Sequence, residues 1–420
     1  MSDSSVSRIP LLPQARSLRS TQDLARHFLL KVLSRIRVGS ITIYDGEDTH
    51  HFGNDDNPGE PHAEIVVPDR AAFGKVLTGG PIASGEAYID GDWSSPDLTM
   101  VTRVFSANMA AMESMQSSQH WYTRLALRIA HAMNRNTHEG SKRNISAHYD
   151  LGNDFFKLFL DASMMYSSAI FDAGETELET AATAKLDEIC RQLELKADDH
   201  LLEIGTGWGG MAIHAATHYG CRVTTTTISR EQYEYARARV RELGLEDRIE
   251  VLCEDYRALT GQYDKLVSIE MIEAVGHDFY SSYFSCCSQL LKDDGKMVIQ
   301  AITITDQRYD RARRSVDYIK RYIFPGGCLP SLEVIAKHLA QDTDMQMVHL
   351  RDITLDYART LAAWRERFAE RLEDVRAMGF DDRFVRMWEF YLCYCEGGFR
   401  ERIIGTVQLA FAKPAYRPAA

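Results

Sequence analysis

The stretch LLEIGTGWGG, residues 201–210, places an apolar pair and an acid directly before four closely spaced glycines. An apolar strand that ends in a glycine-rich turn and runs into a helix is where open α/β sheets bind nucleotides. Gly205 and Gly207 can adopt backbone angles that other residues avoid, and neither carries a Cβ that would keep a ligand away. The helix that follows presents free backbone amides. The stretch therefore predicts a nucleoside site in a doubly wound, mainly parallel sheet.

The glycine spacing alone fits both G-x-G-x-G, usual in S-adenosylmethionine (SAM) enzymes, and G-x-G-x-x-G, the dinucleotide fingerprint. The next predicted strand, residues 221–229, decides between them, because it ends in Thr227-Ile228-Ser229 and not in the acid that holds a dinucleotide ribose. The strand after it, residues 249–256, ends in Asp255 and Tyr256, a polar and an aromatic group suited to an adenine ring. This pattern favours a methyltransferase.

Two further predicted strands bring polar residues to the same edge of the sheet. Residues 265–275 end in Glu270 and Glu273, and residues 295–304 carry Gln300. Ligands bind at the carboxyl ends of such strands, so we expect these side chains at an active site. Two acids three residues apart would equally suit a solvated helix start.

Length and composition bound the class of protein. With 420 residues, 45% of them hydrophobic, the chain can bury a large core in two or more domains. Eight cysteines without regular spacing indicate reduced thiols and neither a disulfide framework nor a zinc site. No apolar run suits a signal peptide or a membrane span, so we expect a cytoplasmic protein. From the cysteine spacing we expect no bound metal. A net charge of -12 argues against nucleic acid as a partner.

The basic residues are unevenly distributed. Residues 1–40 hold seven Lys and Arg against two Asp, and residues 121–147 hold five basic residues against one acid. Both segments carry apolar residues at helical spacing, the pattern of a helix that lies on an anionic membrane surface. An ordinary solvated helix has the same pattern. If the membrane interpretation holds, Arg124, Arg128 and Arg135 are candidate lipid contacts.

The chain divides into three expected parts: an N-terminal α+β domain (1–120), a basic linker (121–146) and the nucleotide-binding domain (147–420). In the first part we predict strands at residues 40–46 and 63–68, a helix at 70–79 and a turn-rich segment at 83–93. We also predict a helical stretch at 146–161.

Several unusual strings occur in order along the chain: HYDLGNDFF, MMYSSAIF, EIGTGWGG, TTTISREQ, EMIEAVGH, YIFPGGCLPS and YCEGGFR. Together they closely resemble the cyclopropane-fatty-acyl-phospholipid synthase family over about residues 60–412. GEAYIDGDW also resembles that family's N-terminal domain. The resemblance implies a class I SAM-dependent methyltransferase fold with a smaller α+β lipid-binding domain. It also implies an activity, the methylenation of cis double bonds in the acyl chains of membrane phospholipids.

The resemblance assigns residues to the SAM site by position. They are Tyr166, Ser167, Glu203, Gly205, Thr206, Gly207, Gly209, Thr227, Ser229, Gln232, Asp255, Tyr256 and Arg257.

The family holds a bicarbonate ion beside the reacting methyl group, and the matching positions are here Glu273, Gln300, Ile302, Ser168 and Tyr357. Serine replaces the usual cysteine and glutamine the usual histidine, as in plant-type members. Attack of an alkene on a sulfonium methyl group creates a carbocation, so the site must stabilise positive charge and then remove a proton. Bicarbonate or Glu273 itself could be that base.

Cys395 matches a family cysteine that could be taken for a catalytic nucleophile. A nucleophilic thiol has no step to perform on an alkene, so packing is the favoured interpretation.

Other functions remain open at this point. The carbocation could lose a different proton and leave a methyl or methylene branch without a ring. A methyltransferase for N or O atoms of small molecules would leave the N-terminal domain unexplained, and a non-catalytic lipid-binding protein would not need an intact glycine turn. The expected partners are an unsaturated membrane phospholipid, reached by peripheral contact with the inner face of the membrane, and a possible second copy of the chain.

Overall fold

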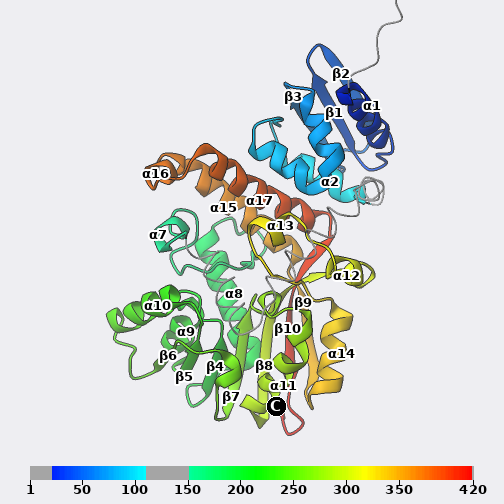
Figure 1. Cartoon of the computed structure of the whole chain (residues 1–420). Coiled ribbons are helices and arrows are strands. Elements are labelled where there is room, and N and C mark those ends of the chain that lie inside the picture. The colour runs from blue at the N-terminus through cyan, green and yellow to red at the C-terminus, as the bar shows by residue number, and fades with distance from the viewer. Residues whose placement is uncertain (1–20, 110–150, 419–420) are drawn as a thin grey trace, which may run out of the picture.

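The computed structural model describes residues 21–109 and 151–418 (Figure 1). The predicted linker, its basic residues Arg124, Arg128 and Arg135, and the first 20 residues lie outside the described ranges. Within these ranges no helix combines the length and apolarity needed to cross a membrane.

The N-terminal part is a small α+β unit. A three-stranded sheet of order β2-β1-β3 pairs β1 with β2 antiparallel and with β3 parallel. Its elements are α1 (Thr21–Leu33), β1 (Ser40–Asp45), β2 (Asp48–Gly53), β3 (His62–Val67), α2 (Ala71–Ile89) and α3 (Leu98–Ala107). Apolar side chains of β1 alternate with more exposed ones, so Ile41 and Ile43 point into the unit beneath the helices.

The predicted strands and helix in this unit are confirmed, but one strand was not predicted and one expectation was wrong. Residues 48–53, DTHHFG, form β2, whose polar composition gives no strand signal and which is held by pairing with β1. The predicted turn-rich segment is helical up to Ile89, because α2 resumes after a kink at Gly80 (φ +67) and Pro81. Proline fits there because the first turn of a helix needs no backbone donor.

The larger part holds a seven-stranded sheet of order β6-β5-β4-β7-β8-β10-β9. The first five strands are parallel, and β10 runs antiparallel to both neighbours. Its strands are β4 (His200–Ile204), β5 (Arg222–Thr226), β6 (Ile249–Leu252), β7 (Tyr263–Ile269), β8 (Leu291–Ile304), β9 (Gln346–Asp352) and β10 (Ile404–Ala412). The strand order reverses between β4 and β7, the position where doubly wound sheets bind ligands.

Helices cover both faces of this sheet, which confirms the predicted doubly wound class. Leu201 points towards α8 and α9, whereas its neighbour Leu202 points towards α11 and α14. The helices and helical turns are α7 (Asn153–Phe156), α8 (Leu178–Leu193), α9 (Gly210–His214), η1 (Ala215–Tyr219), α10 (Arg230–Glu242), η2 (Tyr256–Ala258), η3 (Ile272–Ala274), η4 (His277–Phe279), α11 (Tyr280–Leu290), α12 (Asp306–Ala312), α13 (Tyr318–Tyr322), α14 (Leu332–Asp342), α15 (Thr354–Glu370), α16 (Leu372–Ala377) and α17 (Asp382–Arg400).

Several element predictions in this part need correction. β5 ends at Thr226 and β6 at Leu252, so Thr227 and Asp255 follow their strands instead of ending them. β7 ends at Ile269, so Glu270 and Glu273 follow the strand instead of lying in it. Residues 146–161 were expected to be helical, but in the described portion only α7 is an α-helix, because the following chain turns to bury Phe156 and Phe159.

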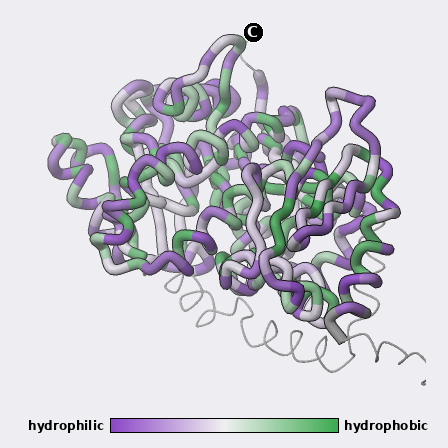
Figure 2. The backbone as a smooth tube through the Cα atoms, turned by 90° about the horizontal axis from the view of Figure 1, so that it is seen from above, coloured by the Kyte–Doolittle hydropathy of each residue, from purple (hydrophilic) through white to green (hydrophobic). Residues whose placement is uncertain are grey.

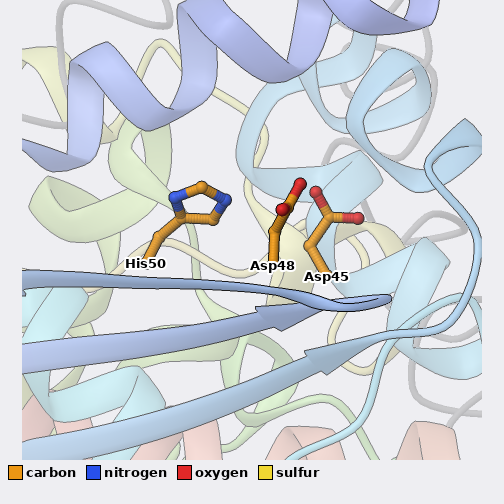
Figure 3. A group of neighbouring side chains, drawn as sticks. All are labelled: Asp45, Asp48 and His50. Carbon is orange, nitrogen blue, oxygen red and sulfur yellow. The ribbon is translucent and has the colours of Figure 1, made fainter.

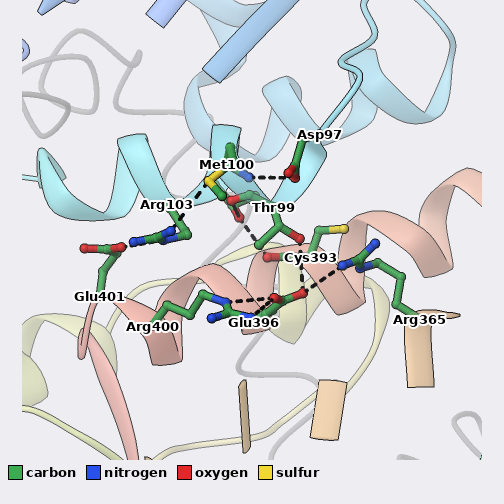
Figure 4. Close-up of polar contacts among 10 residues, drawn as sticks. Asp97, Thr99, Met100, Arg103, Arg365, Cys393, Glu396, Arg400 and Glu401 are labelled. Carbon is green, nitrogen blue, oxygen red and sulfur yellow. Dashed lines mark hydrogen bonds and ion pairs between the residues drawn. The ribbon is translucent and has the colours of Figure 1, made fainter. Parts of the chain in front are cut away.

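Helices α15 and α17 lie between the two sheets (Figure 1), and Figure 2 shows hydrophobic segments running through the interior. Polar contacts join α3 to α17 (Figure 4): Thr99 donates to the buried Glu396 at 3.1 Å, and Arg103 pairs with Glu401 at 2.7 Å. A Cβ on Gly397 would lie 2.3 Å from the Thr102 hydroxyl, so only glycine permits this close approach. The N-terminal unit is thereby fixed against the helices that border the site.

Candidate active site

A single cavity of about 1840 Å³ connects the glycine turn with the interior of the N-terminal unit. Its walls include the loops after β4 to β8, the α15 and α17 helices, and apolar residues of α1, β1, β3, α2 and α3. The carboxyl ends of the parallel strands therefore open into the same space as the N-terminal sheet.

The glycine turn forms the nucleoside end of this cavity. Gly205 and Gly207 have φ angles of +102° and +52°, in the left-handed region that glycine favours. No heavy atom lies within 4 Å of the Cβ that Gly207 would carry, so this side of the turn is open. The Gly205 and Thr206 amides both donate to the Thr226 carbonyl, which ties the turn to the end of β5. The open cradle fits SAM.

The acid of the turn is buried and hydrogen-bonded. Thr225 donates to Glu203 at 2.6 Å, and the Thr225 and Thr206 hydroxyls lie 2.7 Å apart. Burial raises the pKa of Glu203 to about 8, although its bond to Thr225 opposes the rise. Glu203 lines the cavity and could accept from a bound ligand.

After β6, the chain presents a fixed charged pair beside an aromatic ring. Asp255 caps the short turn η2 and accepts from the Arg257 guanidinium at 2.8 and 2.5 Å. Asp255, Tyr256 and Arg257 all line the cavity. An adenine ring beside Asp255 and Tyr256 stays a prediction. Because Asp255 is already paired with Arg257, the flat ring of Tyr256 is the more available of these groups for a base.

Eleven of the residues assigned to SAM line the cavity: Tyr166, Ser167, Glu203, Gly205, Thr206, Gly207, Thr227, Gln232, Asp255, Tyr256 and Arg257. The other two support this wall from behind. Ser229 is the N-cap of α10 and accepts from the Gln232 amide, and Gly209 donates to the Thr206 carbonyl inside the turn. Their roles are thus in shaping the site.

The residues expected around a bicarbonate ion are brought together, but their donors meet at Glu270. The Ser168 amide donates to Glu270 Oε1 at 2.9 Å and Gln300 Nε2 donates to the same oxygen at 2.8 Å. The Tyr357 hydroxyl donates to Oε2 at 2.8 Å. The carboxylate of Glu270 therefore has three donors from three separate segments of the chain.

Glu273 lies beside this group with fewer partners. Its Oε1 accepts from the Ile302 amide, whereas its buried Oε2 has no hydrogen-bond partner. Burial and the neighbouring Glu270 raise the pKa of Glu273 to about 8, which favours the protonated carboxyl.

A buried lysine balances the carboxylates. Lys185 of α8 has no exposed surface and donates to the Ser167 hydroxyl at 2.8 Å. Burial lowers its pKa to about 8, and the attraction of Glu270, Asp161 and Glu203 opposes that shift. Nothing in the local sequence of an amphipathic helix distinguished this lysine from a surface residue.

Aromatic rings line the cavity beside the carboxylates. Tyr357 stacks on Phe399 with ring centroids 4.5 Å apart, and the hydroxyls of Tyr166 and Tyr391 lie 2.9 Å apart. All four residues line the cavity. Ring faces next to carboxyl groups are suited to a developing positive charge.

Cys395 lines the cavity but is not activated. Burial raises the pKa of its thiol, so it remains in the protonated, weakly nucleophilic form. Within residues 21–109 and 151–418 no base is hydrogen-bonded to this thiol, which agrees with a packing role.

We expect Cys395→Ala to retain turnover within about threefold, because a nucleophile's removal would cost far more than the loss of one packed sulfur atom. Initial rates of methyl transfer in the variant and in the native protein test this. A loss of a hundredfold or more with a normal melting temperature would instead make the thiol part of the chemistry.

A second polar cluster, Asp45, Asp48 and His50, lies on the N-terminal sheet (Figure 3). Arg70 pairs with both aspartates, at 3.0 and 2.9 Å, and Arg26 approaches all three side chains. Two guanidinium groups already neutralise the carboxylates and would repel a cation. The cluster is an ion-pair network that holds α1 and α2 against the sheet.

The chain is similar to known lipid-modifying enzymes. The family model of mycolic acid cyclopropane synthetase matches residues 136–409. Tuberculostearic acid methyltransferase UfaA1 of Mycobacterium tuberculosis is 39% identical over 359 residues, covering 84% of this chain and 83% of that protein. Cyclopropane-fatty-acyl-phospholipid synthase of Escherichia coli K12 is 36% identical over 356 residues, covering 84% and 89%.

Solved structures agree with this match. The structure of mycolic acid cyclopropane synthase CmaA1 complexed with SAH and CTAB has a TM-score of 0.61 at 28% identity, and the match covers 65% of this chain and 98% of that one. Cyclopropane synthase MmaA2 from M. tuberculosis gives 0.60 at 30% identity, with 65% and 98% covered. The resemblance and fold expected from the sequence are thereby confirmed: the chain belongs to the mycolic acid cyclopropane synthetase family and is a SAM-dependent methyltransferase.

Proposed function

We propose that the chain transfers a methylene group from SAM to the cis double bond of an unsaturated acyl chain in a membrane phospholipid and closes a cyclopropane ring. One observation carries this proposal: the cavity that begins at the glycine turn passes the carboxylates and continues into an apolar space. A small polar substrate would not need that continuation.

The apolar end of the cavity suits an acyl chain. Its lining residues come from every helix of the N-terminal unit and from two of its strands, among them Leu29, Ile43, Ile65, Phe73, Val101 and Phe105. The volume, about 1840 Å³, exceeds the roughly 300–1,000 Å³ of common small-molecule sites. We therefore assign lipid binding to this unit, and propose the boundaries 1–120, 121–146 and 147–420 for the three parts of the chain.

The residues of the site match the needs of the reaction. SAM supplies an electrophilic methyl group on a sulfonium. Gly205, Gly207, Thr227, Gln232 and Tyr256 would hold it at the carboxyl ends of β4, β5 and β6. The rings of Tyr166 and Tyr357 face the cavity and favour positive charge on the lipid, while the apolar walls exclude water that would quench it.

The opening of the cavity is basic. Residues 307–320, except Tyr309, line the cavity and include five Lys and Arg against two Asp, and several of them are exposed. An anionic phosphate next to an apolar channel is the chemistry of a phospholipid. This supports a membrane lipid as the substrate and peripheral contact with a membrane.

We expect Arg308→Gln/Arg311→Gln/Arg314→Gln to lower turnover on phosphatidylglycerol vesicles roughly 100-fold at low salt, because each basic residue near an anionic surface contributes on the order of 1 kcal/mol. The difference between the variant and the native protein should shrink as salt is raised, since salt screens the attraction between the native basic residues and the anionic lipid. SAM affinity should stay unchanged. Arg237→Gln/Arg241→Gln on α10 is the matched control, and equal losses in both variants would exclude the cavity opening as the lipid contact.

A branched product is the second candidate, because the relative UfaA1 is named for tuberculostearic acid methylation. After methyl transfer, a hydride shift followed by loss of a proton would leave a methylene branch instead of a ring. The same cavity would serve both outcomes, so the product must be measured.

The test is a transfer assay with labelled SAM and vesicles of dioleoyl phospholipid, followed by gas chromatography and mass spectrometry of the fatty acid esters. A ring resists dimethyl disulfide addition, whereas a methylene branch reacts. Label recovered only in a water-soluble amine or alcohol, with none in lipid, would overturn the proposal.

We place this activity at the cytoplasmic face of the membrane, where the eight free cysteines would remain reduced. Docking through Arg124, Arg128 and Arg135 and assembly as a homodimer stay predictions.

A further inference from the structure

Glu270 is bound by three of the five residues that were expected to bind a bicarbonate ion. Its two oxygens take the Ser168 amide, the Gln300 amide and the Tyr357 hydroxyl, all at 2.8–2.9 Å. We propose that the Glu270 carboxylate replaces bicarbonate in this chain and is the general base of the reaction. The proposal rests on the proposed function, because a base is needed only if a carbocation forms.

An open anion site does not fit these residues. Ser168 and Gln300 have no exposed surface and do not line the cavity, whereas Glu270 does. The Ser168 hydroxyl, the group that replaces the family's cysteine, is turned away and donates to the Ala169 carbonyl at 2.9 Å. A bicarbonate ion would have to displace Glu270 to reach either residue.

The backbone holds Glu270 in this position at some cost. Its φ angle is +48°, in the left-handed region that a glutamate rarely adopts. The Glu270 amide donates to the Gln300 carbonyl at 2.7 Å, which continues the pairing of β7 with β8 past the end of the strand. Strain of this kind persists where surrounding contacts enforce it, and it concentrates at functional sites.

The two neighbouring carboxyls divide the roles of anion and acid. Glu270 has three donors and the attraction of Lys185, which favour its ionised form against the effect of burial. Glu273 has the Ile302 amide alone and an oxygen without a partner. Burial raises the pKa of both carboxyls, but the three donors favour the negative charge on Glu270 and leave Glu273 as the better place for a proton.

The step balances without a further reactant. The alkene's π electrons form a bond to the methyl carbon of SAM, and the carbon–sulfur bond breaks with its electron pair left on sulfur. A carbon–hydrogen bond of the transferred carbon then breaks. Its electrons close the third ring bond, and the proton passes to a Glu270 oxygen.

The experiment uses the full chain in buffer depleted of carbon dioxide, with unsaturated vesicles and two variants. The native protein should turn over at its full rate there and gain nothing from added bicarbonate. Glu270→Gln, which keeps the shape, should lose at least a hundredfold in kcat while SAM affinity changes by less than threefold. Glu246→Gln makes the same substitution at an exposed glutamate and should leave kcat unchanged.

Glu270→Gly empties the position and suits a left-handed backbone. We expect it to bind formate and bicarbonate by calorimetry, where the native protein binds neither, and to regain part of its turnover when either anion is added. This binding measurement does not depend on the lipid, so it separates a failure here from a failure of the proposed function.

Two results would overturn the proposal. One is a native protein whose turnover falls in depleted buffer and recovers with bicarbonate, and the other is Glu270→Gln that keeps its turnover within a few-fold. Anion binding by the native protein equal to that of Glu270→Gly would also contradict it.

Discussion

Gly207→Val is expected to weaken SAM binding at least a hundredfold while the protein stays folded. The ideal Cβ at this position meets no heavy atom within 4 Å, so the added side chain would project into the open side of the glycine turn, where the ligand must lie. The φ angle of +52° adds strain, on the order of 1–2 kcal/mol for a residue with a Cβ. Calorimetric titration with SAM measures the loss.

Gly244→Val is the matched control for strain. Gly244 has φ +67°, its Cβ would also meet nothing within 4 Å, and it follows α10 away from the cavity. It should lower the melting temperature about as much as Gly207→Val and leave SAM affinity intact. Equal affinities for SAM in the two folded variants would disprove the assignment of the turn.

Tyr357→Phe should lower turnover at neutral pH by about 10- to 100-fold without changing SAM affinity. The variant keeps the ring that stacks on Phe399 but removes the donor to Glu270 Oε2. A hydrogen bond to a charged group contributes about 1.5–3 kcal/mol, which corresponds to about one to two pKa units.

The direction of the pH effect follows from the partners of Glu270. Burial raises the pKa of Glu270, and its bonds to Gln300, Ser168 and Tyr357 lower it. Removing the Tyr357 donor therefore raises this pKa and reduces the ionised fraction at a given pH. The charged or titratable neighbours Glu273 and Lys185 remain, so the rising limb of the kcat profile should move to higher pH. If kcat falls equally at every pH and its pH profile does not shift, Tyr357 acts by packing alone.

The nucleotide-binding part of the fold was predictable because its signals are local. The Leu201–Gly210 stretch needs glycine for its backbone angles. Successive apolar residues of a strand, such as Leu201 and Leu202, point to opposite faces of the sheet and so to the two helix layers. The polar residues at strand ends met at one edge because parallel strands all end there. Strand limits were less well predicted, since apolar residues continue after Glu270 in the sequence, whereas β7 ends at Ile269.

The contacts that depend on distant segments were not predictable. β2 carries two histidines and forms because β1 offers it a partner. Ser168, Gln300 and Tyr357 lie far apart in the chain, and only the fold shows that one carboxylate takes all three donors. Lys185 similarly reads as an ordinary helix residue until α8 is packed against the sheet.

The central claim is that an acyl double bond accepts the methyl carbon and that this carbon then loses a proton. Transfer from SAM that carries a trideuterated methyl group to dioleoyl phospholipid vesicles, followed by mass spectrometry of the acyl chains, tests both parts. The account predicts a modified acyl chain that retains two of the three deuterium atoms. Retention of all three in the lipid, or deuterium found only outside the lipid, would contradict it.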